Sequence, residues 1–473
     1  MHYLRDRALN LSRIKPNWEN GVIASDSPNK TFCMAPWTHT YISPQSERRM
    51  CCASREEHMF QKQYIDASND KSTGKFKDSG TIQDYKPVSL EEHWNSEYMK
   101  DIRKSLMAGE TIPQCAVCND SILSQSTYRA WFTGRLFKDY IDRAFEETDD
   151  TGHTTMQPIS FDYRVSNLCN FKCRMCGEQL SSTWESEKRK HGHWNPKDQP
   201  FMVPENKKVI QQFQKEVVEE EFWKAICRGD VEEIYWVGGE PLMYEIHWRA
   251  MDRLSQDNNL NKVHLRYNSN LSRVRFGIHY LYDWLPKAKD WTMCASIDGT
   301  GEIGEFIRTG LDWNRWDQNF REGVALPGGK DKMLMDLTLT GPGMFDLKNF
   351  FDYALELDVK IETKRMFAFH PDIVFSMMAW PRHILDRIIQ ENLDYIKPRA
   401  THKQETLIRE LEGMLKSPTF QEQWPDEAER QFFNGRRWQD TIANMRKSEC
   451  SLRIEDIYKR DPELYEWWTR SER

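Results

Sequence analysis

The sequence predicts an α/β fold, in which a partial (β/α)6 barrel follows a cysteine-rich module and precedes a helical region. Three observations predict this fold. Short strand-like segments alternate with helical stretches through the middle of the chain, cysteines gather in tight groups before them, and the chain beyond Trp380 has an almost wholly helical and charged pattern. We place the three regions at residues 1–155, 156–370 and 371–473.

The predicted barrel contains six segments with the length and pattern of β-strands. They are ISFDYRVS (159–166), EIYWVGG (233–239), KVHLRYN (262–268), WTMCASID (291–298), KMLMDLTLT (332–340) and VKIETKRMF (359–367). Helical stretches lie between most of them, most clearly over Val209–Ile226. Folds built from such repeats bind ligands at the C-terminal ends of their strands, so we expect the chemistry there.

The cysteine-rich module is predicted to be partly helical. The segment Leu90–Met107 repeats apolar residues at helical spacing, and Gly109 ends it. A second helix is expected from about Ser126 to Phe145. The intervening segment Lys62–Ser89 is rich in Lys, Asp, Ser and Gly and is predicted to be a solvated loop or loose hairpin.

Composition and charge limit what the chain can do. The 473 residues include 12% aromatic side chains, which disordered chains lack, and carry a net charge of −7. Because there is no overall basic field, we do not expect a nucleic-acid partner, although a local basic groove stays open. The sequence has no run of about 18 apolar residues and no apolar leader, so we expect a cytoplasmic protein without a membrane partner. In a reducing compartment, grouped cysteines are more often metal ligands than disulfides.

The strongest chemical signal is the spacing Cys169-x3-Cys173-x2-Cys176, shortly after the first predicted strand. Three thiolates on one short loop can bind three irons of a cubane cluster, which leaves the fourth iron without a protein ligand. Clusters that only transfer electrons are closed by four cysteines, so an open iron indicates that another molecule binds there. The alternative is a zinc site completed by a remote residue.

This loop and the motifs after it resemble the radical S-adenosylmethionine (SAM) superfamily, over about residues 159–367. The matching motifs follow the strands in order: the cysteine loop, Gly238-Gly239-Glu240-Pro241, Asn268 and Asn270, Ser296-Ile297-Asp298-Gly299, and Arg308. The resemblance implies a TIM-like partial barrel of the radical SAM type and a [4Fe–4S] cluster whose open iron binds SAM. It also implies reductive cleavage of SAM to a 5′-deoxyadenosyl radical, with electrons from a low-potential donor such as flavodoxin or ferredoxin.

Residues of the second motif and the last arginine offer suitable chemistry for the amino acid part of SAM. Glu240 supplies an acceptor for its ammonium group, and Gly238 and Gly239 allow the backbone to approach without a Cβ. Arg308 can pair with its carboxylate through the planar guanidinium. The alternatives are that the glycines and Glu240 form only a turn and that Arg308 is a surface residue.

Three further positions are expected in the same pocket. Ser296 and Asp298 can form hydrogen bonds with the ribose or the carboxylate of SAM, although a capping role for Asp298 is an alternative. Asn270 is a weaker candidate. Many family members carry an aromatic residue before the third cysteine, where this chain has Met175, and an apolar, polarisable methionine can still pack on adenine.

The N-terminal cysteines resemble twitch, a half-length auxiliary-cluster module related to SPASM domains. The resemblance rests on Phe32-Cys33-Met34-Ala35-Pro36-Trp37, Cys51-Cys52, Cys115-Ala116-Val117-Cys118 and the trailing SQSTYR. It implies an auxiliary [4Fe–4S] cluster bound by Cys33, Cys115, Cys118 and one of Cys51 and Cys52, of which we favour Cys52. The same ligands would suit a structural zinc site, and the sequence does not separate the two metals.

The sequence therefore predicts a radical SAM enzyme, an oxidoreductase that abstracts hydrogen from a peptide or another small organic substrate. We assign no catalytic side chain, because the cofactors supply the radical chemistry. The identity of the substrate does not follow from the fold. The alternative from a different class is a non-catalytic zinc or iron–sulfur protein in which the barrel is a binding scaffold.

Overall fold

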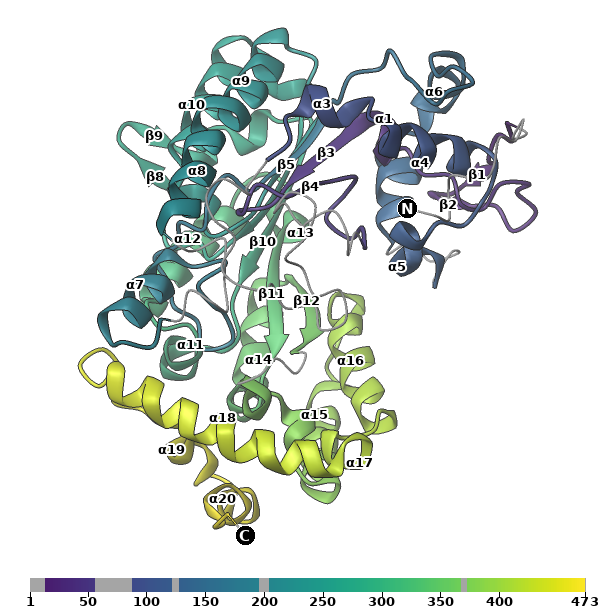
Figure 1. Ribbon diagram of the computed structural model, residues 1–473. Helices are drawn as coiled ribbons and strands as arrows, with labels where there is room; N and C mark the ends of the chain where they lie inside the picture. The colour runs from purple at the N-terminus through teal and green to yellow at the C-terminus, as the bar shows by residue number, and fades with distance from the viewer. Residues whose placement is uncertain (1–12, 56–86, 121–126, 195–203, 367–371, 473) are drawn as a thin grey trace. The chain divides into compact units, whose positions relative to one another are not determined.

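The computed structural model describes residues 13–55, 87–120, 127–194, 204–366 and 372–472, and the chain forms two compact units (Figure 1). Unit 1 comprises Met1–Ser166, Asn195–Gly238 and Arg249–His264, and unit 2 comprises Asn167–Trp194, Gly239–Trp248 and Leu265–Arg473. These units do not follow the regions 1–155, 156–370 and 371–473, which therefore stay predictions. Most of the predicted loop Lys62–Ser89 lies outside the described residues.

Unit 1 contains four strands that pair in the order β6-β5-β3-β4. They are β3 (His39–Ile42), β4 (Arg48–Arg49), β5 (Ser160–Tyr163) and β6 (Glu233–Trp236). β5 is parallel to both β3 and β6, whereas β4 is antiparallel to β3. The sequence does not predict β3, so the cysteine-rich module contributes a strand that pairs with the first predicted strand.

A buried chain of polar side chains fixes the register of these strands. His39 is paired with Ser160, and Ser160 is paired with Glu233. His39 Nδ1 lies 2.6 Å from Ser160 Oγ, and the Ser160 hydroxyl donates a hydrogen bond to the Glu233 carboxylate. All three residues are buried, so a shift in register would leave polar groups that water cannot reach.

The helices of unit 1 surround these strands and build the cysteine-rich module. They are α1 (Ala35–Thr38), α3 (Leu90–Trp94), α4 (Glu97–Met107), α5 (Ala116–Asn119), α6 (Ile141–Glu146), α8 (Pro204–Phe213) and α9 (Glu219–Arg228), with the short strands β1 (Trp18–Glu19) and β2 (Val22–Ile23) and π-helical turns at Ala130–Leu136 and Gln214–Val218.

Two helices predicted for the module are interrupted in the structure. The helix expected over Leu90–Met107 breaks between α3 and α4, because Ser96 begins a new helix by accepting a hydrogen bond from the Met99 N–H at 3.3 Å. The helix expected over Ser126–Phe145 begins outside the described residues and continues as a π-helical turn and then α6. Gly109 ends α4 in the left-handed region with φ of 77°, as predicted.

Unit 2 contains four strands that pair in the order β12-β11-β10-β7. They are β10 (Asp290–Ser296), β11 (Met333–Leu339), β12 (Lys360–Arg365) and β7 (His264–Ser269), whose first residue belongs to unit 1. β10, β11 and β12 are parallel, with Ser296 opposite Asp336 and Asp336 opposite Glu362. All six predicted strands are present, and a mixed α/β fold with parallel strands is confirmed.

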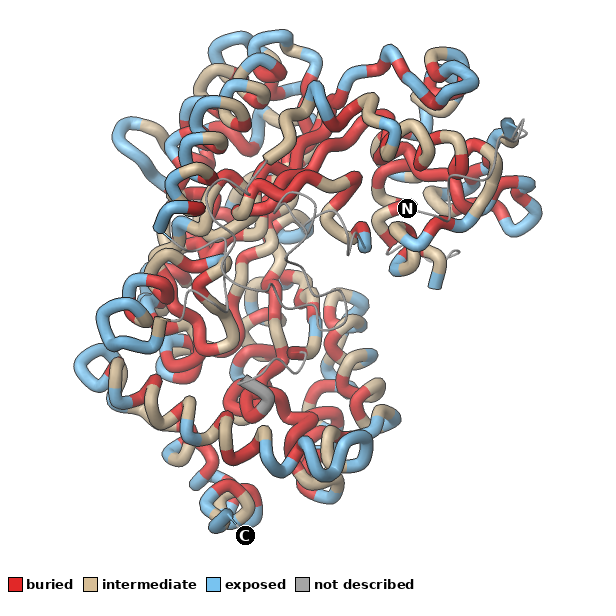
Figure 2. The backbone as a smooth tube through the Cα atoms, in the orientation of Figure 1, coloured by how far each residue is buried: buried red, intermediate tan, exposed pale blue. Residues whose placement is uncertain are grey.

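The helices of unit 2 pack around its strands and continue beyond the last of them. They are α7 (Ser182–Lys190), α11 (Gly301–Ile307), α12 (Trp313–Val324), α13 (Gly329–Lys332), α14 (Leu347–Leu357), α15 (Arg382–Ile396), α16 (Glu405–Lys416), α17 (Phe420–Gln423), α18 (Pro425–Met445), α19 (Ile454–Tyr458) and α20 (Pro462–Thr469), with the hairpin strands β8 (Arg275–Phe276) and β9 (His279–Tyr280). α10 (Glu245–Gln256) has residues in both units. Figure 2 shows that the strands are mostly buried and that the outer turns of the helices are exposed.

A buried ion pair ties the C-terminal helical region to α7. Arg446, which follows α18, donates hydrogen bonds to Glu187 on α7 at 2.7 and 3.0 Å and to the Lys172 carbonyl at 2.7 Å. Burial alone would raise the pKa of Glu187, but the hydrogen bonds from Arg446 and Lys172 outweigh it and lower that pKa. Among the described helices, none is both long and apolar enough to cross a membrane.

We expect Glu187→Gln to lower the free energy of unfolding by about 3 kcal/mol, because it leaves the Arg446 guanidinium buried without a counterion. The matched control is Glu449→Gln, which removes the half-exposed second partner of Lys172 and should cost less than about 1 kcal/mol. Because the folded-state pKa of Glu187 is lowered, the difference between wild type and Glu187→Gln should be full at neutral pH and shrink as the pH falls below 4.5. Urea unfolding followed by circular dichroism measures both effects, and equal losses in the two variants would contradict this role.

Candidate cluster and cofactor sites

The central loop, Cys169–Cys176, is anchored in unit 2 by backbone and side-chain hydrogen bonds. The Lys172 N–H donates to the Thr309 carbonyl at 2.9 Å, and the Arg174 N–H donates to the Ile307 carbonyl at 2.8 Å. The Trp184 indole N–H of α7 donates to the Cys173 carbonyl at 2.7 Å. The protein's own hydrogen bonds therefore hold the loop between α7 and the end of α11.

The thiols of the central loop lie in surroundings that suit thiolates bound to a cation. Burial raises the pKa of Cys169 and of Cys173, and the neighbouring thiol raises that of Cys169 further. Two polar side chains face the sulfurs: Asn270 Nδ2 is 3.9 Å from Cys169 Sγ, and Arg308 Nη1 is 3.9 Å from Cys173 Sγ. These thiols need a positive partner to ionise, which fits the donor set of an iron–sulfur cluster.

The Gly238-Gly239 pair allows the next motif to approach the central loop. A Cβ at Gly239 would lie 2.4 Å from the Leu168 carbonyl oxygen, which is closer than any side chain tolerates. The following N–H, of Glu240, donates to that same carbonyl at 2.8 Å. Gly238 has a φ of 138°, a conformation that glycine adopts without strain. The close approach that the structure shows at Gly239 is to Leu168, the residue before Cys169, and the expected approach of these glycines to SAM stays a prediction.

The Glu240 carboxylate is buried and accepts hydrogen bonds from the chain itself. Its donors are the Asn270 N–H at 2.6 Å, the Ser269 hydroxyl at 2.8 Å and the Leu242 N–H at 3.0 Å. Burial raises the pKa of Glu240 to about 7, although these three donors favour the ionised form. Glu240 therefore connects the turn after β6 to the end of β7, a structural role that the sequence did not indicate.

Arg308 and Asp298 form an ion pair beside the central loop. Arg308 Nε lies 2.6 Å from Asp298 Oδ2, and Asp298 Oδ1 accepts a hydrogen bond from the Thr338 N–H at 2.8 Å. Burial alone would lower the pKa of Arg308, but the Asp298 carboxylate outweighs it and raises that pKa. The Arg308 side chain is 11% exposed and lies against these groups, an arrangement that differs from the alternative of a surface arginine. Met175 is half-buried on the central loop.

Asp336 on β11 is a polar centre that the sequence analysis did not identify. Its carboxylate accepts hydrogen bonds from Asn268 Nδ2 at 3.1 Å, Ser296 Oγ at 3.4 Å and Lys364 Nζ at 2.8 Å, donors that come from β7, β10 and β12. Ser296 therefore faces Asp336. In the sequence, this position could have been recognised as an acidic residue within an otherwise largely apolar strand, two residues before Thr338.

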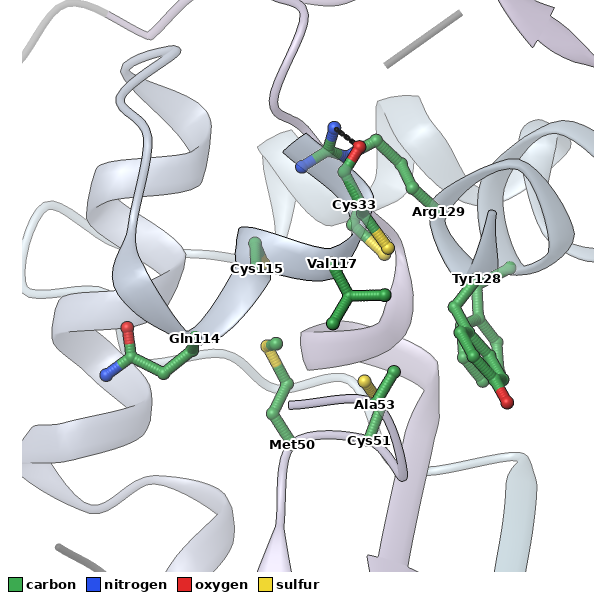
Figure 3. A pocket seen from close by; sticks show the side chains of 11 residues that line it. Cys33, Met50, Cys51, Ala53, Gln114, Cys115, Val117, Tyr128 and Arg129 are labelled. Atoms are coloured by element: carbon green, nitrogen blue, oxygen red, sulfur yellow. Dashed lines mark hydrogen bonds between the residues drawn. The ribbon is translucent and has the colours of Figure 1, made fainter. Parts of the chain in front are cut away.

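The N-terminal cysteines of unit 1 meet at a second site, the four-thiol pocket. Cys33, Cys51, Cys115 and Cys118 line one pocket together with Met50, Ala53, Gln114, Val117, Tyr128, Arg129 and Phe132 (Figure 3). The sequence analysis favoured Cys52 over Cys51 as the fourth ligand, and the structure shows a different arrangement. Cys51 is buried in the pocket, whereas Cys52 is half-buried and does not line it. The Cys52 thiol instead acts electrostatically on Tyr41 and Arg164.

Arg129 provides positive charge at the four-thiol pocket. Burial raises the pKa of Cys33 to about 12, the Cys115 thiol raises it further, and the Arg129 guanidinium acts in the opposite direction. Arg129 is buried, and its Nη2 donates to Asn119 Oδ1 at 2.6 Å. Its Nε finds no hydrogen-bond acceptor among the described residues. This arginine of the SQSTYR segment is therefore suited to balance thiolate charge.

All eleven cysteines lie in described segments, and none of them forms a disulfide. Within the part of the chain that the structure describes, no group of three or more His, Cys, Asp or Glu side chains is arranged to hold a single metal ion. A cubane cluster differs from a single ion in that each cysteine binds a different iron, so the sulfurs do not share one coordination shell.

Comparisons with known proteins address the N-terminal module most directly. Residues 33–119 match the SPASM family model, which is described as an iron–sulfur cluster-binding domain. The expected SPASM-like module is thereby confirmed, and its matched range contains all five N-terminal cysteines. A search of curated proteins finds no match.

Solved structures of Streptococcus suis SuiB are similar over part of the chain. The SuiB structure bound to S-adenosylmethionine aligns with 60% of this chain at 12% identity and a TM-score of 0.31, and a second SuiB structure aligns with 69% of this chain and 70% of its own at 12% identity and a TM-score of 0.34. The aligned part spans 56% of the first SuiB chain.

We expect Glu240→Gln to lower the free energy of unfolding by about 1–3 kcal/mol, because the amide replaces one accepting oxygen with an NH2 donor that faces a backbone or hydroxyl donor. The matched control is Glu245→Gln in the first turn of α10, where the carboxylate is exposed and the change should cost less than about 0.5 kcal/mol. Urea unfolding of the two variants measures the difference. Unchanged stability of Glu240→Gln would refute the structural role of this carboxylate.

Proposed function

We propose that the chain is a radical SAM enzyme that binds a [4Fe–4S] cluster at Cys169, Cys173 and Cys176. The observation that carries the proposal is the central loop, with three cysteines at this spacing and two hydrogen-bond donors facing their sulfurs. When bound, the cluster and SAM supply the chemistry, which is reductive cleavage of SAM to a radical that takes hydrogen from an organic substrate.

The side chains around the central loop bind and orient these cofactors. Asn270 and Arg308 place donors at two of the three sulfurs and lower the cost of thiolate charge in a buried site. Asp298 holds the Arg308 guanidinium from the opposite side, so that its position does not depend on the ligand. Arg308, Asp298, Ser296 and Asn270 remain the candidates for contacts with SAM.

We further propose that the four-thiol pocket binds an auxiliary [4Fe–4S] cluster through Cys33, Cys51, Cys115 and Cys118. The match to the SPASM model and the four thiols on one pocket support this assignment. Arg129 would balance part of the negative charge of the ligated cluster. The auxiliary cluster would relay electrons or anchor the substrate, and a flavodoxin or ferredoxin would supply electrons from outside.

The substrate of the proposed reaction is an organic molecule, a peptide or a smaller compound. Asp336 and Lys364, with Asn268, form a polar group on neighbouring strands of unit 2 and are candidates to contact it. Lys364 is half-exposed at its end of β12, whereas Asp336 is buried. A substrate with both donor and acceptor groups would match this pair.

The test of the proposed function is cleavage of SAM by Cys173→Ala. We expect no 5′-deoxyadenosine when the anaerobically purified variant is reduced with SAM, because the cluster loses one of three ligands, while the iron bound in unit 1 stays in place. The control is Cys227→Ala, which removes an exposed thiol on α9 and should cleave SAM like the wild type. Chromatography of the reaction mixture and iron analysis give both results, and retained cleavage in Cys173→Ala would refute the assignment.

Purified wild-type protein that is colourless and carries zinc would instead support a non-catalytic metal-binding protein.

Replacement of Cys51 and of Cys52 separates the two candidates for the fourth auxiliary ligand. Cys51→Ala should lose the iron and sulfide of the auxiliary cluster, because its sulfur lines the four-thiol pocket, and Cys52→Ala should retain them. Each change is best made in the Cys173→Ala background, where the remaining iron reports on unit 1 alone. Loss of iron in Cys52→Ala with retention in Cys51→Ala would reverse the assignment.

A further inference from the structure

Two cysteines of the central loop meet donors of different charge. Cys169 Sγ accepts a hydrogen bond from the Phe171 N–H at 3.5 Å and lies 3.9 Å from the Asn270 amide nitrogen. Cys173 Sγ lies 3.9 Å from Nη1 of the Arg308 guanidinium. Neutral donors therefore face the first sulfur, and a full positive charge faces the second.

The Arg308 guanidinium is held beside Cys173 by a carboxylate on its other side. Arg308 Nε lies 2.6 Å from Asp298 Oδ2, and the Asp298 side chain is fully buried. Asp298 is itself attached to β11, because its Oδ1 accepts a hydrogen bond from the Thr338 N–H at 2.8 Å. The strand thus fixes the carboxylate, and the carboxylate fixes the position of the positive charge.

A charge at this place acts on any cluster that Cys173 binds. Hydrogen bonds to the sulfurs and nearby charge set the reduction potential of an iron–sulfur cluster, and a cation favours the state that carries one more electron. Cys173 and Asp298 are buried, so solvent screens these charges weakly. Burial raises the pKa of Cys173, the Arg308 guanidinium opposes that rise, and the Asp298 carboxylate adds to it. The two members of the pair therefore act on this sulfur with opposite sign.

We propose that the Asp298–Arg308 pair sets the reduction potential of the cluster at the central loop. This inference rests on the proposed function, because it requires a cluster bound by the three cysteines of that loop. Arg308 raises the potential, whereas Asp298 is a positioning residue that holds the guanidinium and limits the rise. In the reduction the external donor loses one electron and the cluster gains it. No proton moves to or from Arg308, because a guanidinium stays charged in proteins.

Asn270 offers an internal comparison, because its donor is neutral and its distance to sulfur is the same. Its nitrogen donates to Asn170 Oδ1 at 3.0 Å, and its oxygen accepts from the Ser272 N–H at 3.0 Å, so the amide has a fixed orientation. Replacing Asn270 removes a contact with a sulfur but no charge. The two replacements, of Asn270 and of Arg308, separate the effect of charge from that of a donor.

The test is a redox titration of the anaerobically purified full-length protein without SAM, followed by electron paramagnetic resonance. The signal that is missing from Cys173→Ala identifies the central cluster. Arg308→Gln should lower its midpoint potential by about 59 mV or more, which is a tenfold fall in the equilibrium constant of one-electron reduction. Arg308→Lys and Asn270→Ala should each shift it less, because neither removes a charge, and Asp298→Asn should shift it in the opposite direction.

The matched control is Arg430→Gln on α18, which removes the same charge from a side chain that is 68% exposed and should leave the potential unchanged. Iron and sulfide analysis establishes that each variant carries its clusters, and the two Arg308 variants keep the test valid if one does not. An unchanged potential in Arg308→Gln, or shifts of the same sign in Arg308→Gln and Asp298→Asn, would overturn this inference alone. Absence of the central signal from the wild type would overturn the proposed function and this inference with it.

Discussion

Buried thiolate charge is the constraint on which both cysteine sites depend. A buried thiol keeps its proton unless a cation is nearby, and burial raises the pKa of Cys33, Cys51, Cys169 and Cys173. Each unit meets this constraint with an arginine: Arg308 stands beside Cys173, and Arg129 lines the four-thiol pocket. In both places the guanidinium is held by other groups of the chain, so its charge is in position before the metal binds. Both cysteine sites are thus suited to thiolate ligands, which metal binding would deprotonate.

The C-terminal helical region takes part in this arrangement, because it holds the central loop from outside. Arg446 binds Glu187 and the Lys172 carbonyl, and its guanidinium lies 4.1 Å from the centre of the Trp184 ring. Trp184 in turn donates to the Cys173 carbonyl. On the other side, Gly239 and the Glu240 N–H meet the carbonyl before Cys169. The loop is therefore fixed at both ends by residues far apart in the sequence, which is the precision that a cofactor site requires.

The sequence predicted features that repeat along the chain or are closely spaced, such as the strands and the cysteine motifs. It did not predict features that depend on contacts between residues far apart in the sequence. Six strands were predicted because short strand-like segments alternate with helical stretches, whereas β3 lies among the N-terminal cysteines outside that alternation and pairs with β4 and β5. The cysteine motifs named seven candidate ligands, but the choice between Cys51 and Cys52 depends on which of two adjacent side chains turns toward the pocket. Asp336 gave no motif, since its partners come from three other strands. The partners of Arg308 and Glu240 were missed for the same reason.

The two roles of Glu240, expected and observed, are compatible when its acceptor sites are counted. An ionised carboxylate offers about four lone-pair positions. The Asn270 and Leu242 N–H groups and the Ser269 hydroxyl occupy three of them. One position remains, which is what a single N–H of an ammonium group needs. The same three donors fix the orientation of the carboxylate, so the turn after β6 and the end of β7 together hold its remaining acceptor position in place. A residue that holds the fold can in this way keep one acceptor position unused, and Gly239 before it brings the backbone of this turn close to the central loop.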